Sequence, residues 1–353
     1  MPPILAGPMH NDHTADARAS ALHEFLADAL HPVTFSIAPA SSDASFRRYF
    51  RATLHGRSAL APAAESLIAM DAPPPHEDCR PFVRVAALLE AAGVHAPKVL
   101  VQDVERGFLL LTDLGTTMYL DALDAASAPA LYLDAIDALV LWQRATRDGV
   151  LPRYDEPLLA RELALFPDWY VARHLGRALD ADERNALDAS FRAILANNLA
   201  QPQVYVHRDY HSRNLMVSSP NPGVLDFQDA VLGPITYDLV SLLRDAYVEW
   251  DEERQLDWTI RYWERARKAG LPVASDFGIF WRDFEWMGVQ RQLKVLGIFA
   301  RLFHRDGKDV YLLHMPRVMG YLRKAARRYR ELDALTRLLD ALEERTTTVG
   351  YTF

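Results

Sequence analysis

Two neighbouring stretches of the sequence decide which fold and which chemistry we expect. Residues 204–217 read VYVHRDYHSRNLMV, and residues 223–229 read GVLDFQD. Their apolar runs predict two short buried strands on either side of a polar loop, and a third strand that ends at a carboxylate. This arrangement brings Asp209, Asn214 and Asp226 to one edge of a small sheet.

These three oxygen-bearing side chains form a set that phosphoryl transfer requires. One carboxylate, Asp209, would orient an attacking hydroxyl and accept its proton. The amide oxygen of Asn214 and the carboxylate of Asp226 suit Mg²⁺, a hard cation that prefers oxygen ligands and that bridges nucleotide phosphates. We therefore expect a phosphotransferase that uses ATP and Mg²⁺.

The same residues resemble known families. The pattern His-x-Asp-x-x-x-x-Asn followed by Asp-Phe is similar to the catalytic and metal-binding loops of the protein-kinase-like superfamily. Residues 233–245, GPITYDLVSLLRD, resemble the aminoglycoside phosphotransferase family, which phosphorylates small molecules. The resemblance implies an α+β, two-lobe, protein-kinase-like fold. It also implies that Asp238 braces the catalytic loop by accepting its backbone N–H groups, and we place His207 in the same supporting role.

The N-terminal third of the chain predicts a small sheet. We expect residues 1–111 to form a nucleotide-binding lobe and residues 112–115 to form a hinge, where the backbone at Asp113 and Leu114 receives adenine as in kinases. The sequence pattern predicts two helices, at 14–30 and 79–92. It also predicts four strands, at 46–54, 66–70, 99–104 and 107–111.

Residues 116–353 predict a larger helical lobe that carries the catalytic loop and the acceptor site. Short apolar runs interrupt the helical pattern only around the two stretches quoted above. The predicted helices span 127–147, 158–178, 181–199, 251–269, 277–304 and 310–345.

The expected phosphate-binding turn departs from the kinase pattern. Residues 41–45, SSDAS, contain no glycine, so backbone amides and the hydroxyls of Ser41, Ser42 and Ser45 would hold the phosphates. Kinases also place a lysine on the third strand, but here the corresponding position near Met70 is apolar. The only lysine before residue 268 is Lys98, which falls in a loop before a later strand.

Three arginines after this turn could supply the missing charge. Arg47, Arg48 and Arg51 lie in the segment 46–54, where alternation places Arg47 and Arg51 on one face and Arg48 on the other. An arginine can hold a phosphate with two hydrogen bonds. The alternative is that all three side chains are simply solvated.

The acceptor site is predicted from the helix at 277–304. Arg291 and Lys294 belong to a basic stripe, with Arg301 and Arg305, that would attract a carboxylate if it faces a cleft. The alternative is a solvated helix face. Two residues near Asp226 are also candidates, because Gln228 can face an acceptor amide and Asp229 is either a second metal ligand or a helix cap.

Four further segments resemble the bacterial anomeric kinases of cell-wall sugar recycling. They are residues 45–51 (SFRRYFR), 69–74 (AMDAPP), 163–170 (LALFPDWY) and 290–299 (QRQLKVLGIF). Those kinases use ATP to phosphorylate the anomeric hydroxyl of N-acetylmuramate and N-acetylglucosamine in peptidoglycan recycling. The resemblance implies the same substrates here, a product that passes to a sugar-1-phosphate uridylyltransferase, and an absent lysine that is a feature of this branch. The lactyl carboxylate of N-acetylmuramate agrees with the basic stripe.

Three other functions stay open at this point. The same fold serves aminoglycoside and other small-alcohol phosphotransferases. The missing lysine allows a nucleotide-binding pseudokinase, although the set of Asp209, Asn214 and Asp226 is intact. The spacing of His207, Asp209 and His211 also allows a zinc or iron hydrolase, although no further cluster of His or Glu with ligand spacing completes that site.

Composition limits the remaining classes. The chain has 353 residues with 39 basic and 47 acidic side chains, a net charge of −8 that disfavours nucleic-acid binding. Cys79 is its single cysteine, so it needs no oxidising compartment. Residues 1–12 lack a secretory pattern, and no run of about 18 apolar residues predicts a membrane span. We therefore expect a cytoplasmic enzyme that acts on a small molecule.

Overall fold

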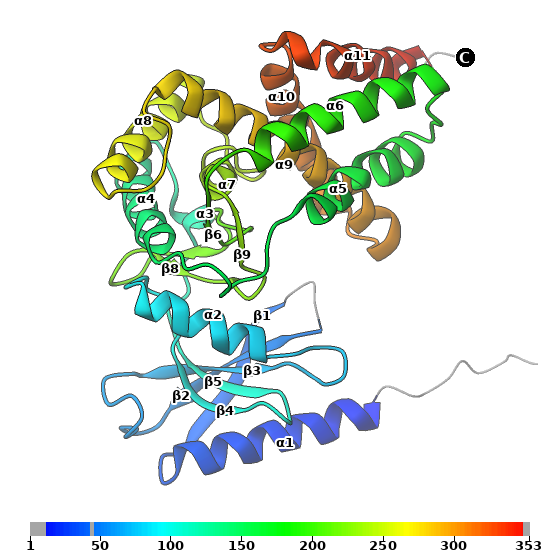
Figure 1. The fold of residues 1–353 in the computed structure, drawn as a ribbon. Coiled ribbons are helices and arrows are strands. Elements are labelled where there is room, and N and C mark those ends of the chain that lie inside the picture. Colours follow the sequence, from blue (N-terminus) through cyan, green and yellow to red (C-terminus); the bar gives the residue numbers. More distant parts are fainter. Residues whose placement is uncertain (1–11, 43–45, 349–353) are drawn as a thin grey trace, which may run out of the picture. The chain divides into compact units, whose positions relative to one another are not determined.

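The structure of the chain, a computed structural model, describes residues 12–42 and 46–348 and divides into two compact units (Figure 1). Unit 1 comprises residues 1–90 and 96–115, and unit 2 comprises residues 91–95 and 116–353. The first unit contains the larger sheet and the second is mostly helical. The predicted division into a sheet-rich N-terminal part and a helical C-terminal part is confirmed.

Unit 1 is built on one antiparallel sheet with the strand order β1-β2-β3-β5-β4. The buried apolar residues of β3 and β5 alternate in direction, so the sheet offers an apolar surface on both sides. Figure 1 shows α1 and α2 on opposite sides of it. The elements are α1 (Asp12–Leu30), β1 (Phe35–Ser42), β2 (Arg48–Leu54), β3 (Ser66–Asp71), α2 (Arg80–Ala91), β4 (Val99–Asp103) and β5 (Phe108–Thr112).

Helix α1 and the sheet share one apolar core. Leu22, Phe25 and Leu26 from α1 pack in a buried cluster with residues of β3 and β5, among them Leu67 and Phe108. The phenyl rings of Phe25 and Phe108 lie 5.7 Å apart between centroids. Burial of large side chains such as these contributes about 1.5–3 kcal/mol each, before corrections for the unfolded state.

Strand β1 corrects one part of the sequence prediction. Ser41 and Ser42, which we assigned to a turn, pair with Tyr49 and Arg48 on β2 and so belong to the strand. Strand β1 is at the edge of the sheet, so its backbone pairs on one side only, with β2. Ser45, the third serine of the proposed phosphate turn, lies outside the described residues.

Unit 2 places two small sheets among its helices. Strand β6 (Gln203–Val206) pairs with β9 (Val231–Pro234), and β7 (Leu215–Met216) pairs with β8 (Gly223–Val224). The helices are α3 (Tyr119–Ala122), α4 (Ala128–Arg144), α5 (Glu156–Leu165), α6 (Ala181–Leu199), α7 (Tyr237–Leu243), α8 (Glu252–Lys268), α9 (Phe277–Asp306), α10 (Met315–Ala326) and α11 (Asp333–Thr348), with a π-helix at Phe166–His174 and 3₁₀ turns at Asp309–His314 and Arg330–Leu332.

Two predicted helices are wrong as single elements. The helix expected at 158–178 changes at Phe166 from α5 into the π-helix, because Pro167 has no N–H and its ring disfavours a continued α-helix. The helix expected at 310–345 is broken after α10. There Arg328 and Tyr329 both bond to Glu285 of α9, so contacts with another helix turn the chain away.

Helix α9 is the central helix of unit 2. It begins after Asp276, whose carboxylate accepts the N–H of Ile279 at 3.0 Å, and it ends at Gly307 in the left-handed conformation. At Gly297 a β-carbon would lie 2.4 Å from the carbonyl group of Leu165, so only glycine allows this close approach to the end of α5. This contact fixes α9 against α5 and thereby brings their side chains together.

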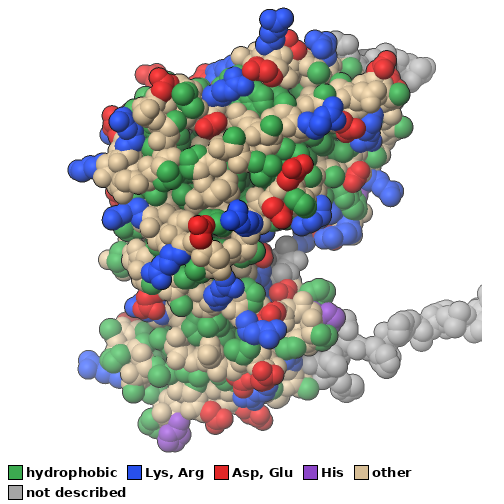
Figure 2. All heavy atoms as spheres, viewed as in Figure 1, with side chains coloured by type: hydrophobic (Ala, Val, Ile, Leu, Met, Phe, Trp, Pro, Cys, Tyr) green, Lys and Arg blue, Asp and Glu red, His purple; other side chains and the backbone are tan. Residues whose placement is uncertain are grey.

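The charged side chains are mixed in sign on the surface that can be seen. On the face drawn in Figure 2, basic and acidic residues are interspersed. None of the helices in the described part of the chain has the length and apolar character that crossing a membrane requires.

Candidate active site

The polar loop that follows β6 is held by Asp238, the second residue of α7. The Asp238 carboxylate accepts the backbone N–H of His207 at 2.6 Å and that of Arg208 at 3.0 Å. Asp238 is completely buried, so no water competes for these bonds. The carboxylate therefore fixes the backbone immediately before Asp209.

The imidazole of His207 joins this loop to the strand that leads to Asp226. Its Nε2 lies 2.9 Å from the carbonyl oxygen of Leu225, and the backbone N–H of Asp209 donates to its Nδ1 at 3.3 Å. Burial lowers the pKa of His207 to about 4, so the ring is neutral at pH 7. A neutral ring fits both contacts when Nε2 carries the proton.

Asn214 lies between the other two predicted site residues. Its amide group donates to the backbone carbonyl of Asp209 at 2.9 Å and lies 3.3 Å from a carboxylate oxygen of Asp226. The backbone N–H of Leu225 donates to the carbonyl of Asn214 at 2.9 Å, which ties the two stretches of sequence together. The structure thus brings Asp209, Asn214 and Asp226 into one site within unit 2.

The backbone of this site is strained at two positions. Arg208 has φ 81° and Asp226 has φ 61°, and no other non-glycine residue in ranges 12–42 and 46–348 has a positive φ. Such conformations cost roughly 1–3 kcal/mol and persist only where the surroundings enforce them. Both strained residues flank the proposed chemistry, Arg208 next to Asp209 and Asp226 at the proposed metal site.

The electrostatic environment keeps Asp209 ionised. Burial alone would raise the pKa of this carboxyl, but the positive charges of Lys294 and Arg291, together with the ring of His211, outweigh it and lower the pKa to about 2. Burial lowers the pKa of His211 itself, so the lasting positive charges are those of Lys294 and Arg291. The Asp209 carboxylate itself accepts no hydrogen bond from the described residues. It is therefore charged and available to a hydroxyl group.

The donor atoms fit Mg²⁺ better than zinc. The Asn214 side chain uses its N–H groups in the site, and its carbonyl oxygen makes no hydrogen bond to the described residues. That oxygen and the Asp226 carboxylate are hard donors of the kind Mg²⁺ prefers. No group of three His, Cys, Asp or Glu side chains in the described ranges is placed to hold a metal.

Asp229 and Gln228 follow Asp226 in a turn. Asp229 is exposed, and the next element is strand β9 rather than a helix, so its interpretation as a helix cap is wrong. The Gln228 amide N–H donates to Asp226 at 2.8 Å, while its buried carbonyl oxygen has no partner among the described residues. Gln228 therefore orients Asp226 and leaves one acceptor free.

The three arginines of unit 1 are engaged by carboxylates. Arg48 bonds to the buried Asp71 of β3, and Arg51 bonds to Asp113 with Nε 2.6 Å from the carboxylate. Arg47, which precedes β2, lies 3.8 Å from a carboxylate oxygen of Glu77. The alternative that all three are simply solvated is therefore wrong.

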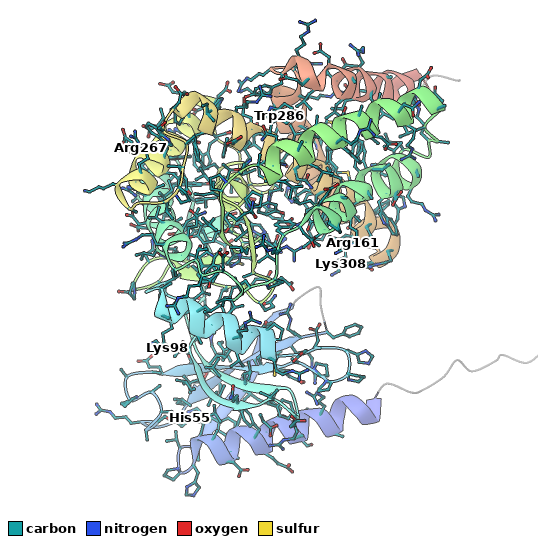
Figure 3. The ribbon with its side chains drawn as sticks, in the orientation of Figure 1. His55, Lys98, Arg161, Arg267, Trp286 and Lys308 are labelled. Atoms are coloured by element: carbon teal, nitrogen blue, oxygen red, sulfur yellow. The ribbon has the colours of Figure 1, made fainter. Side chains whose placement is uncertain are left out.

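The predicted hinge residues have structural contacts of their own. The Asp113 carboxylate also accepts the Ser66 hydroxyl at 2.7 Å and the backbone N–H of Gly115 at 2.9 Å, and Leu114 is buried. Lys98, labelled in Figure 3, pairs with Glu90 of α2 at 2.7 Å. Lys98 precedes β4, as the sequence predicted, and is not on β3.

The basic stripe of α9 is buried at Arg291 and Lys294, partly buried at Arg301 and exposed at Arg305. Lys294 is 7% exposed and lies 3.1 Å from Glu162 of α5, so its interpretation as part of a solvated face is wrong. Arg291 is 4% exposed and makes no hydrogen bond or ion pair with any described residue, and its buried Nη1 atom has no partner. Of the two, Arg291 has donors free for an acceptor anion.

Sequence reasoning missed Glu162. This glutamate lies one residue before the segment 163–170 that carried the family resemblance, and no motif singles it out. In the structure its carboxylate bonds to Arg208 of the catalytic loop at 2.7 Å. The sequence around it, with Arg161 before it and Glu156 at the start of the helix, does not distinguish it from an ordinary charged helix residue.

Removal of the Asp238 carboxylate is expected to disorder the loop without touching the substrate. Asp238→Ala leaves two buried N–H groups without acceptors, at about 1–3 kcal/mol each, and Asp238→Asn keeps one acceptor oxygen and costs less. We expect kcat to fall in both variants, and to fall further in Asp238→Ala than in Asp238→Asn. The KM for the acceptor should change little in either variant. Urea unfolding and steady-state kinetics measure the two effects, and an Ala variant with the kcat of the parent chain would contradict the prediction.

Comparison with known proteins shows which family and which relatives the chain is similar to. The phosphotransferase enzyme family (APH) matches residues 36–277. The N-acetylmuramate/N-acetylglucosamine kinase of Pseudomonas aeruginosa is 53% identical over 306 residues, which cover 87% of this chain and 88% of that protein. The protein of the same name from Neisseria meningitidis is 50% identical over 324 residues, which cover 90% of this chain and 94% of the relative.

Solved structures of low sequence identity share the fold. An ADP-bound aminoglycoside phosphotransferase matches with a TM-score of 0.53 at 14% identity, over 86% of this chain and 97% of the other. A choline/ethanolamine kinase family protein from Mesorhizobium loti matches with a TM-score of 0.56 at 15% identity, over 92% and 98%. The protein-kinase-like fold expected from the sequence is confirmed. Since the family match covers more than half of the chain, this protein belongs to the phosphotransferase enzyme family, and it is a kinase.

Proposed function

We propose that this chain uses ATP and Mg²⁺ to phosphorylate the anomeric hydroxyl of N-acetylmuramate and N-acetylglucosamine, in the recycling of peptidoglycan sugars. The relatives named for these two sugars are 50–53% identical over most of the chain. The single observation that carries the proposal is the site formed by Asp209, Asn214 and Asp226.

In the proposed mechanism Asp209 acts on the acceptor. Its charged carboxylate accepts a hydrogen bond from the anomeric hydroxyl, aligns the oxygen for attack on the γ-phosphorus of ATP, and takes the proton as the new O–P bond forms. The bond between the γ-phosphorus and the β,γ-bridging oxygen breaks, and ADP leaves. An anomeric hydroxyl is more acidic than an ordinary alcohol, so a carboxylate is an adequate base. Asn214 and Asp226 would hold Mg²⁺, which neutralises charge on the nucleotide phosphates when it is bound.

The charges around Asp209 argue for an anionic acceptor and against a polycationic one. Lys294 and Arg291 are the two cations that act most strongly on Asp209. A polycationic aminoglycoside would be repelled by such surroundings, whereas the lactyl carboxylate of N-acetylmuramate would be attracted. The buried and unpaired Nη1 atom of Arg291 is the donor that we assign to that carboxylate.

This assignment predicts a selective loss in Arg291→Met. A hydrogen bond between charged groups contributes about 1.5–3 kcal/mol, so kcat/KM for N-acetylmuramate should fall by about 10- to 150-fold. The value for N-acetylglucosamine, which has no carboxylate, should change by much less. Steady-state kinetics with both sugars measure the difference, and an equal loss on both would show that Arg291 does not read the lactyl group.

The substrate proposal is tested by comparing ATP consumption with N-acetylmuramate, N-acetylglucosamine and kanamycin. We expect turnover with the two amino sugars and none with kanamycin. Turnover with kanamycin alone would replace the proposal by an aminoglycoside phosphotransferase. Nucleotide binding without phosphorylation of either amino sugar would favour the pseudokinase.

Other parts of the proposal rest on the family resemblance. We assign residues 1–111 to nucleotide binding, with the Ser41–Ser45 segment and nearby arginines as phosphate contacts, and Asp113 with Leu114 as the adenine-binding hinge. The phosphorylated sugar would then serve a sugar-1-phosphate uridylyltransferase, and a cytoplasmic location agrees with a supply of ATP.

A further inference from the structure

A buried charge cluster lies beneath the catalytic loop in unit 2. Glu162 of α5 accepts the Arg208 guanidinium at 2.7 Å and lies 3.1 Å from the Lys294 ammonium, both at the same carboxylate oxygen. The Tyr154 hydroxyl donates to the other oxygen. Lys294 also donates to the Tyr237 hydroxyl at 2.9 Å. One carboxylate thus joins two cations from separate parts of the chain.

The contact with Arg208 explains how the loop keeps its conformation. Arg208 has φ 81°, a backbone conformation that favours glycine, and it immediately precedes Asp209. Asp238 holds its N–H group, and Glu162 holds its guanidinium. An arginine in this conformation therefore depends on one contact at its backbone N–H and one at its guanidinium group. A glycine would need neither contact.

Lys294 is placed to support the site rather than to bind substrate. It is 7% exposed, and its ammonium group already contacts Glu162 and Tyr237. Without the charge of Glu162, the buried Lys294 and the partly buried Arg208 would lose their shared carboxylate, while both cations still act on Asp209. They would then draw the Asp209 side chain toward themselves and away from the acceptor.

We propose that Glu162 is a positioning residue for the phosphoryl transfer: it anchors Arg208 and Lys294 and so holds Asp209 in the geometry that the acceptor hydroxyl requires. This inference rests on the proposed role of Asp209. It assigns Lys294 to the same positioning cluster, in place of the substrate contact expected from the basic stripe.

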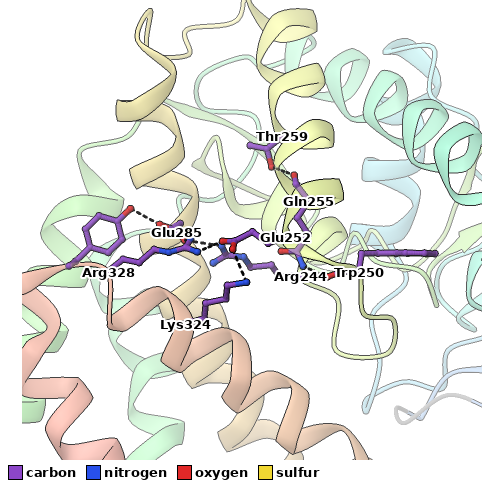
Figure 4. A network of polar contacts seen from close by, with 9 residues as sticks. Arg244, Trp250, Glu252, Gln255, Thr259, Glu285, Lys324 and Arg328 are labelled. Atoms are coloured by element: carbon purple, nitrogen blue, oxygen red, sulfur yellow. Dashed lines mark hydrogen bonds and ion pairs between the residues drawn. The ribbon is translucent and has the colours of Figure 1, made fainter. Parts of the chain in front are cut away.

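A second buried glutamate provides a matched control. Glu285 of α9 accepts Arg244 at 3.1 Å, together with Arg328 and the Tyr329 hydroxyl, so it too joins two cations and a tyrosine. Figure 4 shows this network, which extends through Arg328 to Glu252 and Lys324. None of its members is among the charges that act most strongly on Asp209. The variant Glu285→Gln therefore measures the effect of losing a buried carboxylate on the structure alone, away from Asp209.

The test compares Glu162→Gln with Glu285→Gln. Both variants are expected to lose stability in urea. Only Glu162→Gln should lower kcat, by roughly 10- to 100-fold, because a small misplacement of a catalytic group has an effect of that size. Its KM values for ATP and N-acetylglucosamine should stay within about twofold of the parent chain. Equal effects of both variants on kcat, or an unchanged kcat in Glu162→Gln, would overturn the proposal.

A rescue experiment separates positioning from general damage. Glycine adopts the conformation of Arg208 without an anchor and removes one of the two cations, so adding Arg208→Gly to Glu162→Gln should recover part of the lost kcat. A purely structural role predicts that the second change only adds to the damage.

Hydrogen exchange gives a readout that needs no substrate. In Glu162→Gln the backbone amides of residues 207–209 should exchange faster than in the parent chain, and in Glu285→Gln they should not. Unchanged exchange there would overturn the inference even if the substrate differs from the one proposed. A parent chain that phosphorylates neither amino sugar would instead refute the proposed function, and the exchange data would still decide the role of Glu162.

Discussion

Asp209→Asn is expected to lower kcat by about 10²- to 10⁴-fold, the range over which a positioned general base accelerates a reaction. Asparagine has the size of aspartate but cannot take the proton of the anomeric hydroxyl. Since the Asp209 carboxylate accepts no hydrogen bond from the described residues, the change breaks no hydrogen bond of that side chain with them. Affinity for ATP should therefore stay close to that of the parent chain.

Calorimetric titration measures the affinity of Asp209→Asn for ATP, and steady-state kinetics with N-acetylglucosamine measure its kcat. Asp257→Asn is the control, because this carboxylate on α8 is about half exposed and, among the described residues, pairs with Arg261 one helical turn away. If Asp209→Asn loses ATP binding and turnover to the same extent, Asp209 has a structural role instead.

Asp226→Asn should produce the second large loss. Asparagine tolerates the positive φ of this position, so the backbone can keep its conformation while one negative charge is removed. We expect kcat to fall by about 10²-fold or more, because an electrostatic contact to the reacting group is lost. The Mg²⁺ concentration for half-maximal rate should rise by about 10- to 100-fold, as for other weakened metal sites.

Titration of the rate with MgCl₂ measures this requirement, and Asp229→Asn is the informative companion. Asp229 is exposed in the turn after Asp226, and its interpretation as a second metal ligand is open. A raised Mg²⁺ requirement in both variants would assign Asp229 to the metal site. An unchanged requirement in Asp226→Asn would contradict our assignment of the metal to that carboxylate.

The catalytic loop could be predicted because its information is local. Asp209 and Asn214 are five residues apart, and the strands that flank them are apolar runs, so the pattern itself indicates that the side chains converge. The resemblance then supplied the role of Asp238, which is 29 residues away from Asp209 in the sequence. The contact between Asp238 and the catalytic loop could be predicted because both belong to a motif with fixed spacing.

The surroundings of the site could not be predicted in the same way. Helical periodicity places Arg291 and Lys294 on one face of α9, but it does not reveal that α5 and α7 cover that face. Glu162 has no motif, and its contacts with Arg208 and Lys294 bridge 46 and 132 residues of chain (208 − 162 and 294 − 162). The sequence also does not reveal that Arg48 and Arg51 are paired. The fold places Asp71 of β3 beside Arg48, and Asp113, which follows β5, beside Arg51.

The position of the new phosphate tests the central claim most directly. A sugar phosphorylated at its anomeric oxygen can no longer open to the aldehyde, so it loses its reducing end, whereas phosphorylation at any other hydroxyl leaves the reducing end intact. The purified chain with MgATP and N-acetylglucosamine is therefore assayed for ADP formed and for reducing ends lost. The account predicts one reducing end lost for each ADP formed. Formation of ADP and a phosphorylated sugar with the reducing ends unchanged would contradict it.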